Sequence, residues 1–258
     1  MAGLQYRVER SGAAAETLNT LKAVLFDLDD TLFDHRLCAQ TALSELHAAH
    51  DEFRASPFPE FERLHASFLE DLHRRVMTGE MPLEEARRER FRRLFAALGA
   101  TPAEHVIARA AETYRDGYRR IRQPMSGAAA LLAAVKRRAR VGIVSNNLLE
   151  EQQDKLRHCA LDAFIDELVV SEEAGVSKPD PRIFEIALER LGCSAGEVVM
   201  VGDSWSADIA GAKAAGIRAI WFNPLGHERP VPDPTVEELR ALEPADEAMR
   251  VIFRDGDA

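Results

Sequence analysis

The chain has 258 residues, of which 46% are hydrophobic and 29% are charged, and its net charge is −10. This composition is typical of a folded globular protein and excludes a chain that is disordered throughout. The acidic balance disfavours non-specific binding to nucleic acid or to anionic membranes, although a metal ion and a few lysines can reverse the potential locally.

The first predicted element is a short buried strand over residues 22–27 (KAVLFD). A long helical region follows, from about residue 36 to residue 121, in which apolar residues recur at helical spacing. Gly79 and Gly99 end two of its segments. Residues 101–104 (TPAE) resemble a capping box with proline at the first helical position. The region is therefore predicted to be a block of about four helices.

After Pro124 the pattern changes to strands that alternate with helices. Helices are expected around 131–135 and at 148–158, 181–191 and 207–215, and strands are expected at 141–145, 165–170, 198–201 and 219–222. Such alternation predicts βαβ units and a parallel sheet. The first strand must join the same sheet, so the helical block is an insertion into an α/β core. A last helix is expected to start at Thr235, after a proline-rich stretch.

Polar side chains stand at four predicted strand ends, where open parallel sheets bind their ligands. Asp27 and Asp29 follow the first strand and lie two residues apart, so they can face one site. Two carboxylates this close repel each other, which raises a pKa unless a cation lies between them. Mg²⁺ suits oxygen ligands of this kind. A simple polar turn after the strand is the alternative interpretation.

The other three clusters follow later strands. Ser145 and Asn146 offer a hydroxyl and backbone N–H groups that can hold phosphate oxygens, or can cap the next helix. Lys178 could deliver a charge to a phosphate, or could be a solvated loop lysine. Asp203 ends a strand, and Asp208 falls in the first turns of a helix, where acids often only complement the dipole. Each cluster alone is weak, but four in order at strand ends point to one site.

These clusters resemble the four signature motifs of the haloacid dehalogenase-like superfamily. The resemblance is carried by Asp27-x-Asp29-x-Thr31, Ser145-Asn146, Lys178-Pro179 and Gly202-Asp203-x4-Asp208. It covers about residues 22–34 and 140–222, and the helical block resembles the cap domain that this family inserts after its first strand. It implies an α/β fold with a Rossmann-like core over residues 19–34 and 122–228 and an all-helical cap over 35–121. Residues 1–18 and 229–258 would be an N-terminal extension and a C-terminal tail.

The resemblance implies a phosphatase that works through an aspartyl-phosphate. Asp27 would attack phosphorus, and Asp29 would protonate the leaving oxygen and later deprotonate a water. Mg²⁺ would be held by Asp27, by the backbone carbonyl of Asp29 and by Asp203. Asp30 would lie on the other side of the strand end and serve the local structure.

The same resemblance assigns the groups that bind the phosphoryl oxygens. Ser145, the backbone near Asn146 and Lys178 would bind these oxygens. Asp208 would orient Lys178 or a metal-bound water rather than bind the metal, and Thr31 would support the site.

Particular residues bear on the other activities of this family. Haloacid dehalogenases lack an acid at the position of Asp29, which argues against that activity. Phosphonoacetaldehyde hydrolases need a cap lysine, and no lysine occurs between Lys22 and Lys136. A sugar-phosphate mutase shares the core and stays open. A non-catalytic binding protein is disfavoured because Asp27 and Asp29 are both present.

The expected partner is a small soluble phosphorylated metabolite, with no nucleic acid and no membrane, since no apolar run approaches the ~20 residues of a membrane span. The sequence FDLDDTLFD, the helical cap and SEEAGVSKP are similar to bacterial nucleotidases, which implies a nucleoside monophosphate; a sugar phosphate or phosphoglycolate is the alternative. Three dispersed cysteines and a polar N-terminus without a signal-peptide pattern predict a cytoplasmic protein. The sequence gives no indication of the oligomeric state.

Overall fold

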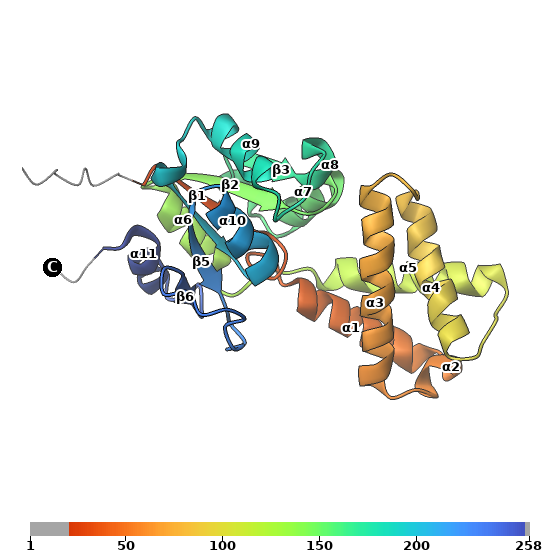
Figure 1. Cartoon of the computed structure of the whole chain (residues 1–258). Coiled ribbons are helices and arrows are strands. Elements are labelled where there is room, and N and C mark those ends of the chain that lie inside the picture. Colours follow the sequence, from red (N-terminus) through yellow and green to blue (C-terminus); the bar gives the residue numbers. More distant parts are fainter. Residues whose placement is uncertain (1–20, 256–258) are drawn as a thin grey trace, which may run out of the picture.

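The computed structural model describes residues 21–255. Six parallel strands form one sheet in the order β3-β2-β1-β4-β5-β6. The strands are β1 (Ala23–Phe26), β2 (Arg140–Ser145), β3 (Glu167–Val170), β4 (Val198–Gly202), β5 (Arg218–Phe222) and β6 (Glu237–Leu239). This sheet, flanked by helices, confirms the predicted α/β fold with a parallel sheet (Figure 1).

The strand β1 lies at the centre of the sheet. Its last residue, Phe26, is in register with Ile143 of β2 and with Val201 of β4. All four residues of β1 are buried, as expected for a parallel strand that is covered on both faces. Because β1, β2 and β4 are aligned, the residues that follow these strands emerge at the same edge of the sheet.

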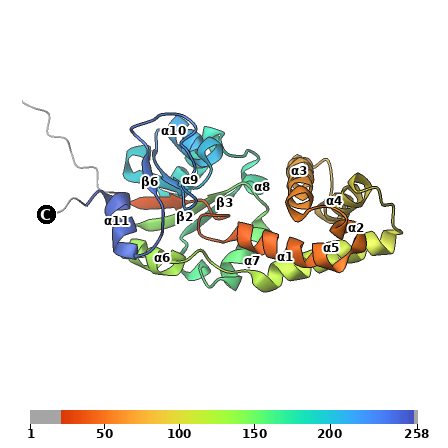
Figure 2. The same ribbon diagram turned by 90° about the horizontal axis from the view of Figure 1, so that it is seen from below.

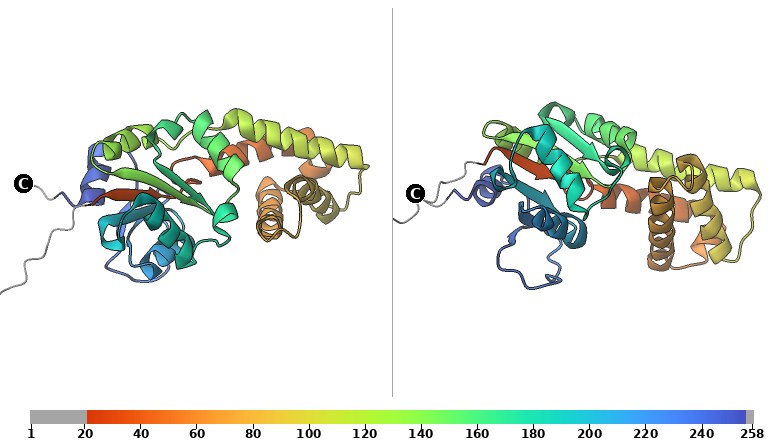
Figure 3. Two further views of the ribbon diagram at one scale, coloured as in Figure 1. Left: turned by 90° about the horizontal axis from the view of Figure 1, so that it is seen from above. Right: turned by 45° about the horizontal axis from the view of Figure 1, so that its top comes forward.

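Helices cover both faces of the sheet (Figures 2 and 3). Val24 and Phe26 face the layer that contains α6 (Ala128–Lys136), α7 (Leu149–His158) and α11 (Ala245–Phe253). Ala23 and Leu25 face the layer that contains α9 (Pro181–Leu191) and α10 (Ala210–Ala214). Because successive side chains of β1 point to opposite faces of the sheet, they contribute to two separate hydrophobic cores.

An insertion of helices separates β1 from the rest of the sheet. It consists of α1 (His35–Ala49), α2 (Asp51–Arg54), α3 (Phe58–Met77), α4 (Leu83–Ala97) and α5 (Glu104–Ile121). Its hydrophobic core is its own and is built around Phe53, Phe61, Phe91 and Phe95. The insertion lies beyond the carboxyl ends of the strands (Figure 1).

Two short connections join this insertion to the sheet. They lie side by side, since Asp34 N donates to Gln123 O at 3.1 Å and Met125 N donates to Leu32 O at 2.9 Å. Asp30, just before the first connection, has a φ of 60° and accepts a hydrogen bond from Arg36 N. This is the local structural contact expected for Asp30.

The prediction of a last helix from Thr235 was wrong. Residues 237–239 form β6 instead, which pairs with the otherwise open edge of β5. The last helix, α11, begins at Ala245, directly after Pro244. Proline disfavours helical geometry in the residue before it, so the helix starts only beyond that point.

Other element boundaries also differ from the predictions. The capping box over 101–104 was wrong: α5 begins at Glu104, and its N-cap residue Ala103 has no side chain that could bond to the helix. The helix predicted over 207–215 is a π-helical turn, Trp205–Ile209, followed by α10. The strand β3 is shorter than predicted because the chain before it forms a 3₁₀ turn at Asp162–Phe164.

The remaining helical elements are α8 (Ser171–Ala174) and a 3₁₀ turn at Ala195–Glu197. Among residues 21–255, no helix combines the length and the apolar character that crossing a bilayer requires.

Candidate active site at the carboxyl edge of the sheet

Lys178 is the centre of a buried ionic cluster. Its ammonium nitrogen lies 2.5 Å from Asp27 Oδ1 and 2.7 Å from Asp208 Oδ1, and it donates to Val144 O at 2.7 Å. An ammonium group has three N–H donors, and these three acceptors satisfy all of them. Lys178 is therefore no solvated loop lysine, because the cluster fixes its charge beside the carboxylate of Asp27.

The side chain of Asn146 holds the backbone of Lys178. Asn146 Nδ2 donates to Lys178 O at 2.9 Å, and Lys178 N donates to Asn146 Oδ1 at 2.7 Å. These two bonds join the loop after β2 to the loop before α9. The side chain of Asn146 therefore positions Lys178. Only the backbone of Asn146 is left for the predicted contact with phosphate.

A third carboxylate, that of Asp203, lies close to the two that contact Lys178. Asp27, Asp203 and Asp208 each offer an oxygen, and these oxygens all lie within 4.8 Å of one another. Burial raises the pKa of Asp27 well above its ordinary value, opposed by Lys178 and reinforced by Asp208 and Asp203. Burial and the neighbouring Asp208 raise the pKa of Asp203 to about 7. A divalent cation would relieve this repulsion, so the donor set fits Mg²⁺.

Asp208 is the least available of the three carboxylates. Its Oδ1 is bound by Lys178, and its Oδ2 accepts a hydrogen bond from Ser204 N at 2.9 Å. Gly202 lies against it, since a Cβ there would come within 2.4 Å of Asp208 Oδ2. These contacts would let Asp208 orient Lys178, and that role stays a prediction.

Asp203 is placed by contacts from two other strand ends. The hydroxyl of Thr31 accepts from Asp203 N at 3.1 Å and lies 3.4 Å from Asp203 Oδ1. Trp221 Nε1 donates to Asp203 O at 2.8 Å. Thr31 is fully buried, so it can support Asp203 as expected from the motif.

The side chain of Asp29 points to different partners from those of Asp27. Its Oδ1 lies 2.6 Å from Lys155 Nζ, and its Oδ2 accepts from Gln152 Nε2 at 2.9 Å and lies 3.4 Å from Asn147 Nδ2. Burial would raise the pKa of this carboxyl, but Lys155, His35 and the hydrogen bonds outweigh it and hold that pKa below its ordinary value. The Asp29 side chain does not belong to the cluster of three carboxylates. Only its backbone carbonyl is a candidate metal ligand.

Gln152 and Lys155 were not foreseen from the sequence. Both are buried residues of α7, one turn apart, on the face that meets Asp29. Gln152 Nε2 also donates to the buried hydroxyl of Ser145 at 2.5 Å, so it joins the first and second motifs. The available signal was a pair of polar residues at helical spacing directly after the second motif.

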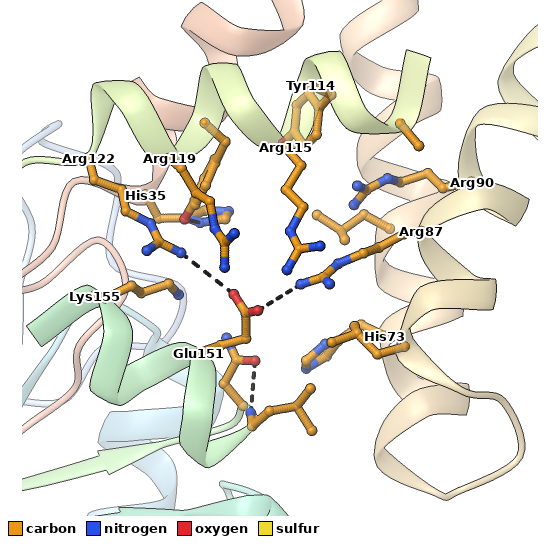
Figure 4. Close-up of a pocket in the computed structure, with 16 residues that line it drawn as sticks. His35, His73, Arg87, Arg90, Tyr114, Arg115, Arg119, Arg122, Glu151 and Lys155 are labelled. Atoms are coloured by element: carbon orange, nitrogen blue, oxygen red, sulfur yellow. Dashed lines mark hydrogen bonds and ion pairs between the residues drawn. The ribbon is translucent and has the colours of Figure 1, made fainter. Parts of the chain in front are cut away.

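A cavity of about 160 Å³ opens beside Asp29, between the insertion and α7. Its lining includes His35, Asn147 and Lys155 from the neighbourhood of Asp29, and residues of α3, α4 and α5 from the insertion (Figure 4). No residue of the insertion could be assigned a function from the sequence, so this cavity was not foreseen.

The fold and the site together define an α/β enzyme with a carboxylate-based site at the carboxyl edge of a parallel sheet. A sequence model described as haloacid dehalogenase-like hydrolase matches residues 21–216. The chain belongs to this family. It is thus a hydrolase, and it carries the family's motifs in the matched region.

Three relatives with named activities are phosphatases. The chain is 31% identical to pyrimidine 5′-nucleotidase YjjG of Escherichia coli over 85% of its own length and 95% of that protein. It is 33% identical to a glyceraldehyde 3-phosphate phosphatase of Methanothermobacter thermautotrophicus (79% and 86%). It is 32% identical to a phosphoserine phosphatase of Thermus thermophilus (86% and 98%). These relatives confirm the expectation of a phosphatase of this family.

The fold also matches solved structures. The HAD-hydrolase YfnB of Bacillus subtilis, described as bound to magnesium, superposes with a TM-score of 0.69 at 28% identity, covering 91% of this chain and 99% of that one. An L-2-haloacid dehalogenase of Xanthobacter autotrophicus superposes with a TM-score of 0.66 over 90% of this chain and 99% of that one. Its 21% identity indicates a shared fold alone.

Proposed function

We propose that the protein is a Mg²⁺-dependent phosphomonoesterase that hydrolyses a small phosphorylated metabolite through an aspartyl-phosphate at Asp27. The observation that carries the proposal is the buried cluster of Asp27, Lys178 and Asp208 with Asp203 beside it. The carboxylate of Asp27, the ammonium of Lys178 and a group of three carboxylates lie together there, which supports a nucleophile beside a positive charge and a cation site.

Asp27 is the proposed nucleophile because it follows the central strand and cannot easily shift. Its backbone N–H donates to Val201 O at 2.9 Å, which extends the pairing of β1 with β4. Its oxygen would form a bond to phosphorus as the bond from phosphorus to the leaving oxygen breaks. Ser145 would bind the oxygens of the transferred group, and Lys178 would do so by exchanging its bond to Asp27 Oδ1 for one to a phosphoryl oxygen.

Asp27, Asp203 and the backbone carbonyl of Asp29 would hold Mg²⁺. The ion would supply positive charge beside the phosphoryl group when bound.

Asp29 is the proposed acid and base. It would give a proton to the leaving oxygen, and then take one from the water that hydrolyses the aspartyl-phosphate. The ionised form favoured by Lys155 suits the second role. A phosphate dianion that approaches Asp29 would raise its pKa, which suits the first role.

The insertion would act as a cap over this site. Residues 35–121 would form the cap, and residues 19–34 and 122–228 the core. The insertion touches the core where Arg87 Nη2 lies 2.7 Å from Glu151 Oε1 and where His73 Nε2 lies 3.0 Å from Asn146 O. Such a cap would keep bulk water from the aspartyl-phosphate and would admit only small esters.

The relatives do not point to one leaving group, because they act on nucleotides, on a triose phosphate and on phosphoserine by name. The expectation of a nucleoside monophosphate therefore stays a prediction, with a sugar phosphate or phosphoglycolate as the alternative. A mutase stays open as well. No lysine lies in residues 35–121, which disfavours phosphonoacetaldehyde hydrolysis by a cap lysine.

Removal of divalent metal is the test of the proposed function. We expect hydrolysis of p-nitrophenyl phosphate to fall by at least ~100-fold after exhaustive chelation, because a bound metal supplies several kcal/mol of charge stabilisation. Addition of Mg²⁺ should restore the rate. It should also raise the unfolding temperature, since it relieves the repulsion among Asp27, Asp203 and Asp208. Full activity in excess chelator would contradict the metal assignment.

Lys178→Ala is expected to reduce both activity and stability. Loss of its charge should lower kcat/KM for p-nitrophenyl phosphate by roughly 10²–10³, the usual effect of removing one group that stabilises transition-state charge. It also leaves two buried carboxylates without their partner, which should cost roughly 3–5 kcal/mol in urea unfolding. Lys213→Ala, on an exposed part of α10, is the matched control and should change neither quantity. Unchanged unfolding of Lys178→Ala would return this residue to the solvated alternative.

A further inference from the structure

The cavity beside Asp29 is lined mainly by cationic side chains. Six of its lining residues carry a positive charge, and only one, Glu151, is a carboxylate. The six are Arg87, Arg90, Arg115, Arg119, Arg122 and Lys155. Figure 4 shows the charged ends of Arg87, Arg115, Arg119 and Arg122 around Glu151, with Arg90 farther away, beside Tyr114. This concentration of positive charge stands out on a chain whose net charge is −10.

Ion pairs within the described residues do not use up this charge. Lys155 pairs with Asp29, Arg122 pairs with Asp154 at 2.6 Å, and Arg119 shares Asp154 at 3.6 Å. The remaining pairs are those of Arg87 with Glu151 and Glu84, Arg115 with Glu84, and Arg122 with Glu151. Four carboxylates therefore pair with five of the six cations, so the cavity keeps an excess of positive charge.

Arg90 is the cation without a carboxylate. Among residues 21–255 no carboxylate lies within 4.0 Å of its guanidinium, and its buried Nε has no hydrogen-bond partner. Its guanidinium carbon lies 5.0 Å from the ring centre of Tyr114 and 5.2 Å from that of Phe91. Arg115 Nε and Arg122 Nε are likewise buried without partners. Buried donors of charged groups are costly when they are unpaired. An anion in the cavity would accept hydrogen bonds from these arginines and lower that cost.

The cavity lies on the side of the reaction where the leaving group must be. Asp29 would protonate the leaving oxygen, and two residues that contact Asp29, Lys155 and Asn147, line the cavity. The part of the substrate beyond the leaving oxygen therefore extends toward Arg90 and its neighbours. Its size is limited, since about 160 Å³ is smaller than the ~300–1,000 Å³ of pockets for drug-sized ligands.

We propose that the substrate is a short phosphomonoester whose leaving group carries a second anionic group, a carboxylate or another phosphate, which binds Arg90 and the adjoining arginines. The inference rests on the proposed phosphomonoesterase activity and assigns the substrate class of that site. It favours the phosphoglycolate-like alternative over a nucleoside monophosphate, because a nucleoside has no second anion to offer.

The first experiment compares esters that differ only in the second anion. We expect kcat/KM for 2-phosphoglycolate to exceed that for 2-hydroxyethyl phosphate at least tenfold, or kcat/KM for propane-1,3-diol bisphosphate to exceed that for the monophosphate by as much. The first result identifies a carboxylate and the second identifies a phosphate. Equal rates within both pairs, or a higher kcat/KM for uridine monophosphate than for all of them, would overturn the inference and leave the phosphatase assignment intact.

The second experiment assigns the preference to Arg90. In Arg90→Gln we expect the ratio of kcat/KM within the preferred pair to fall roughly 10–100-fold, the range for losing a charged hydrogen bond. Arg88→Gln is the matched control, because Arg88 lies on the same helix and is exposed. It should leave the ratio unchanged. An equal loss for both members of the pair in Arg90→Gln would overturn the role of this arginine in recognition.

A binding measurement separates this inference from the proposed function. Calorimetry on Asp27→Asn with Mg²⁺ requires no turnover, and we expect it to show tighter binding of the ester with the second anion. Addition of Arg90→Gln to that variant should remove the difference. If the wild-type protein hydrolyses no ester but Asp27→Asn still binds the ester with the second anion more tightly, the phosphatase proposal is refuted and the anion site is supported. Equal binding of both esters would refute the anion site.

Discussion

Asp27→Asn is expected to abolish turnover and any trapped phospho-enzyme. An amide at this position keeps the shape of the side chain but removes the nucleophile. Of the other two carboxylates, Asp208 is held by Lys178 and Ser204 N, and Asp203 is the proposed metal ligand, so neither is expected to replace it. Rates with p-nitrophenyl phosphate should fall to the background of the assay. Mass spectrometry after a rapid acid quench should find no phosphorylated protein.

The fold of this variant should stay intact. Asp27 is crowded by Asp203 and Asp208, so removal of one negative charge relieves repulsion in protein without metal. We therefore expect its unfolding temperature in chelator to be no lower than that of the wild type. Asp30→Asn is the control and should keep both turnover and stability, since its amide oxygen can still accept the hydrogen bond from Arg36 N. Near wild-type turnover in Asp27→Asn would contradict the covalent mechanism.

Asp29→Asn is expected to slow turnover by roughly 10²–10⁴, the range for losing a general acid–base group. The metal site should be nearly unaffected, because the Asp29 side chain lies with Lys155 and Gln152 rather than with the three carboxylates. The loss should be largest for esters with poor leaving groups, which need the proton. It should be smallest for p-nitrophenyl phosphate, whose leaving oxygen departs as an anion.

The measurements are steady-state kinetics over a series of leaving groups and a titration of the activity with Mg²⁺. Asp29→Asn should steepen the dependence of the rate on the leaving group, while the Mg²⁺ concentration for half-maximal rate stays close to that of the wild type. A loss of the same size for every leaving group would contradict the role of Asp29 as acid. A large rise in the Mg²⁺ requirement would place its side chain at the metal.

The central part of the fold could be predicted because its signals are local. The apolar run of β1 and the alternation of strands and helices after Pro124 each follow from neighbouring residues, and the order of clusters at strand ends follows from the parallel sheet. The strand β6 could not be predicted. Glu237–Leu239 has little strand character of its own and becomes a strand because β5 offers it an open edge.

Part of the candidate site could likewise be predicted from the sequence, and part of it could not. Asp27, Lys178 and Asp203 could be placed together because each follows a strand, or the loop after one, at the same edge of the sheet. The arginines of the cavity could not be singled out among 28 in the chain. Their meaning depends on which faces of α4 and α5 turn toward α7, and this is decided by contacts between segments that are distant in sequence.

The central position of β1 has a consequence for how the two aspartates respond to movement of the insertion. Asp27 directly follows a strand that is paired on both sides, and Asp29 lies two residues on, where Lys155 and Gln152 of α7 hold its side chain. Both carboxylates are therefore anchored outside the insertion. A rotation of the insertion about its two connections would leave the nucleophile and the proton donor in place and would change only what covers them. Closure would then govern access of substrate and water to the site, while the geometry of the two aspartates would stay the same in the open and closed states.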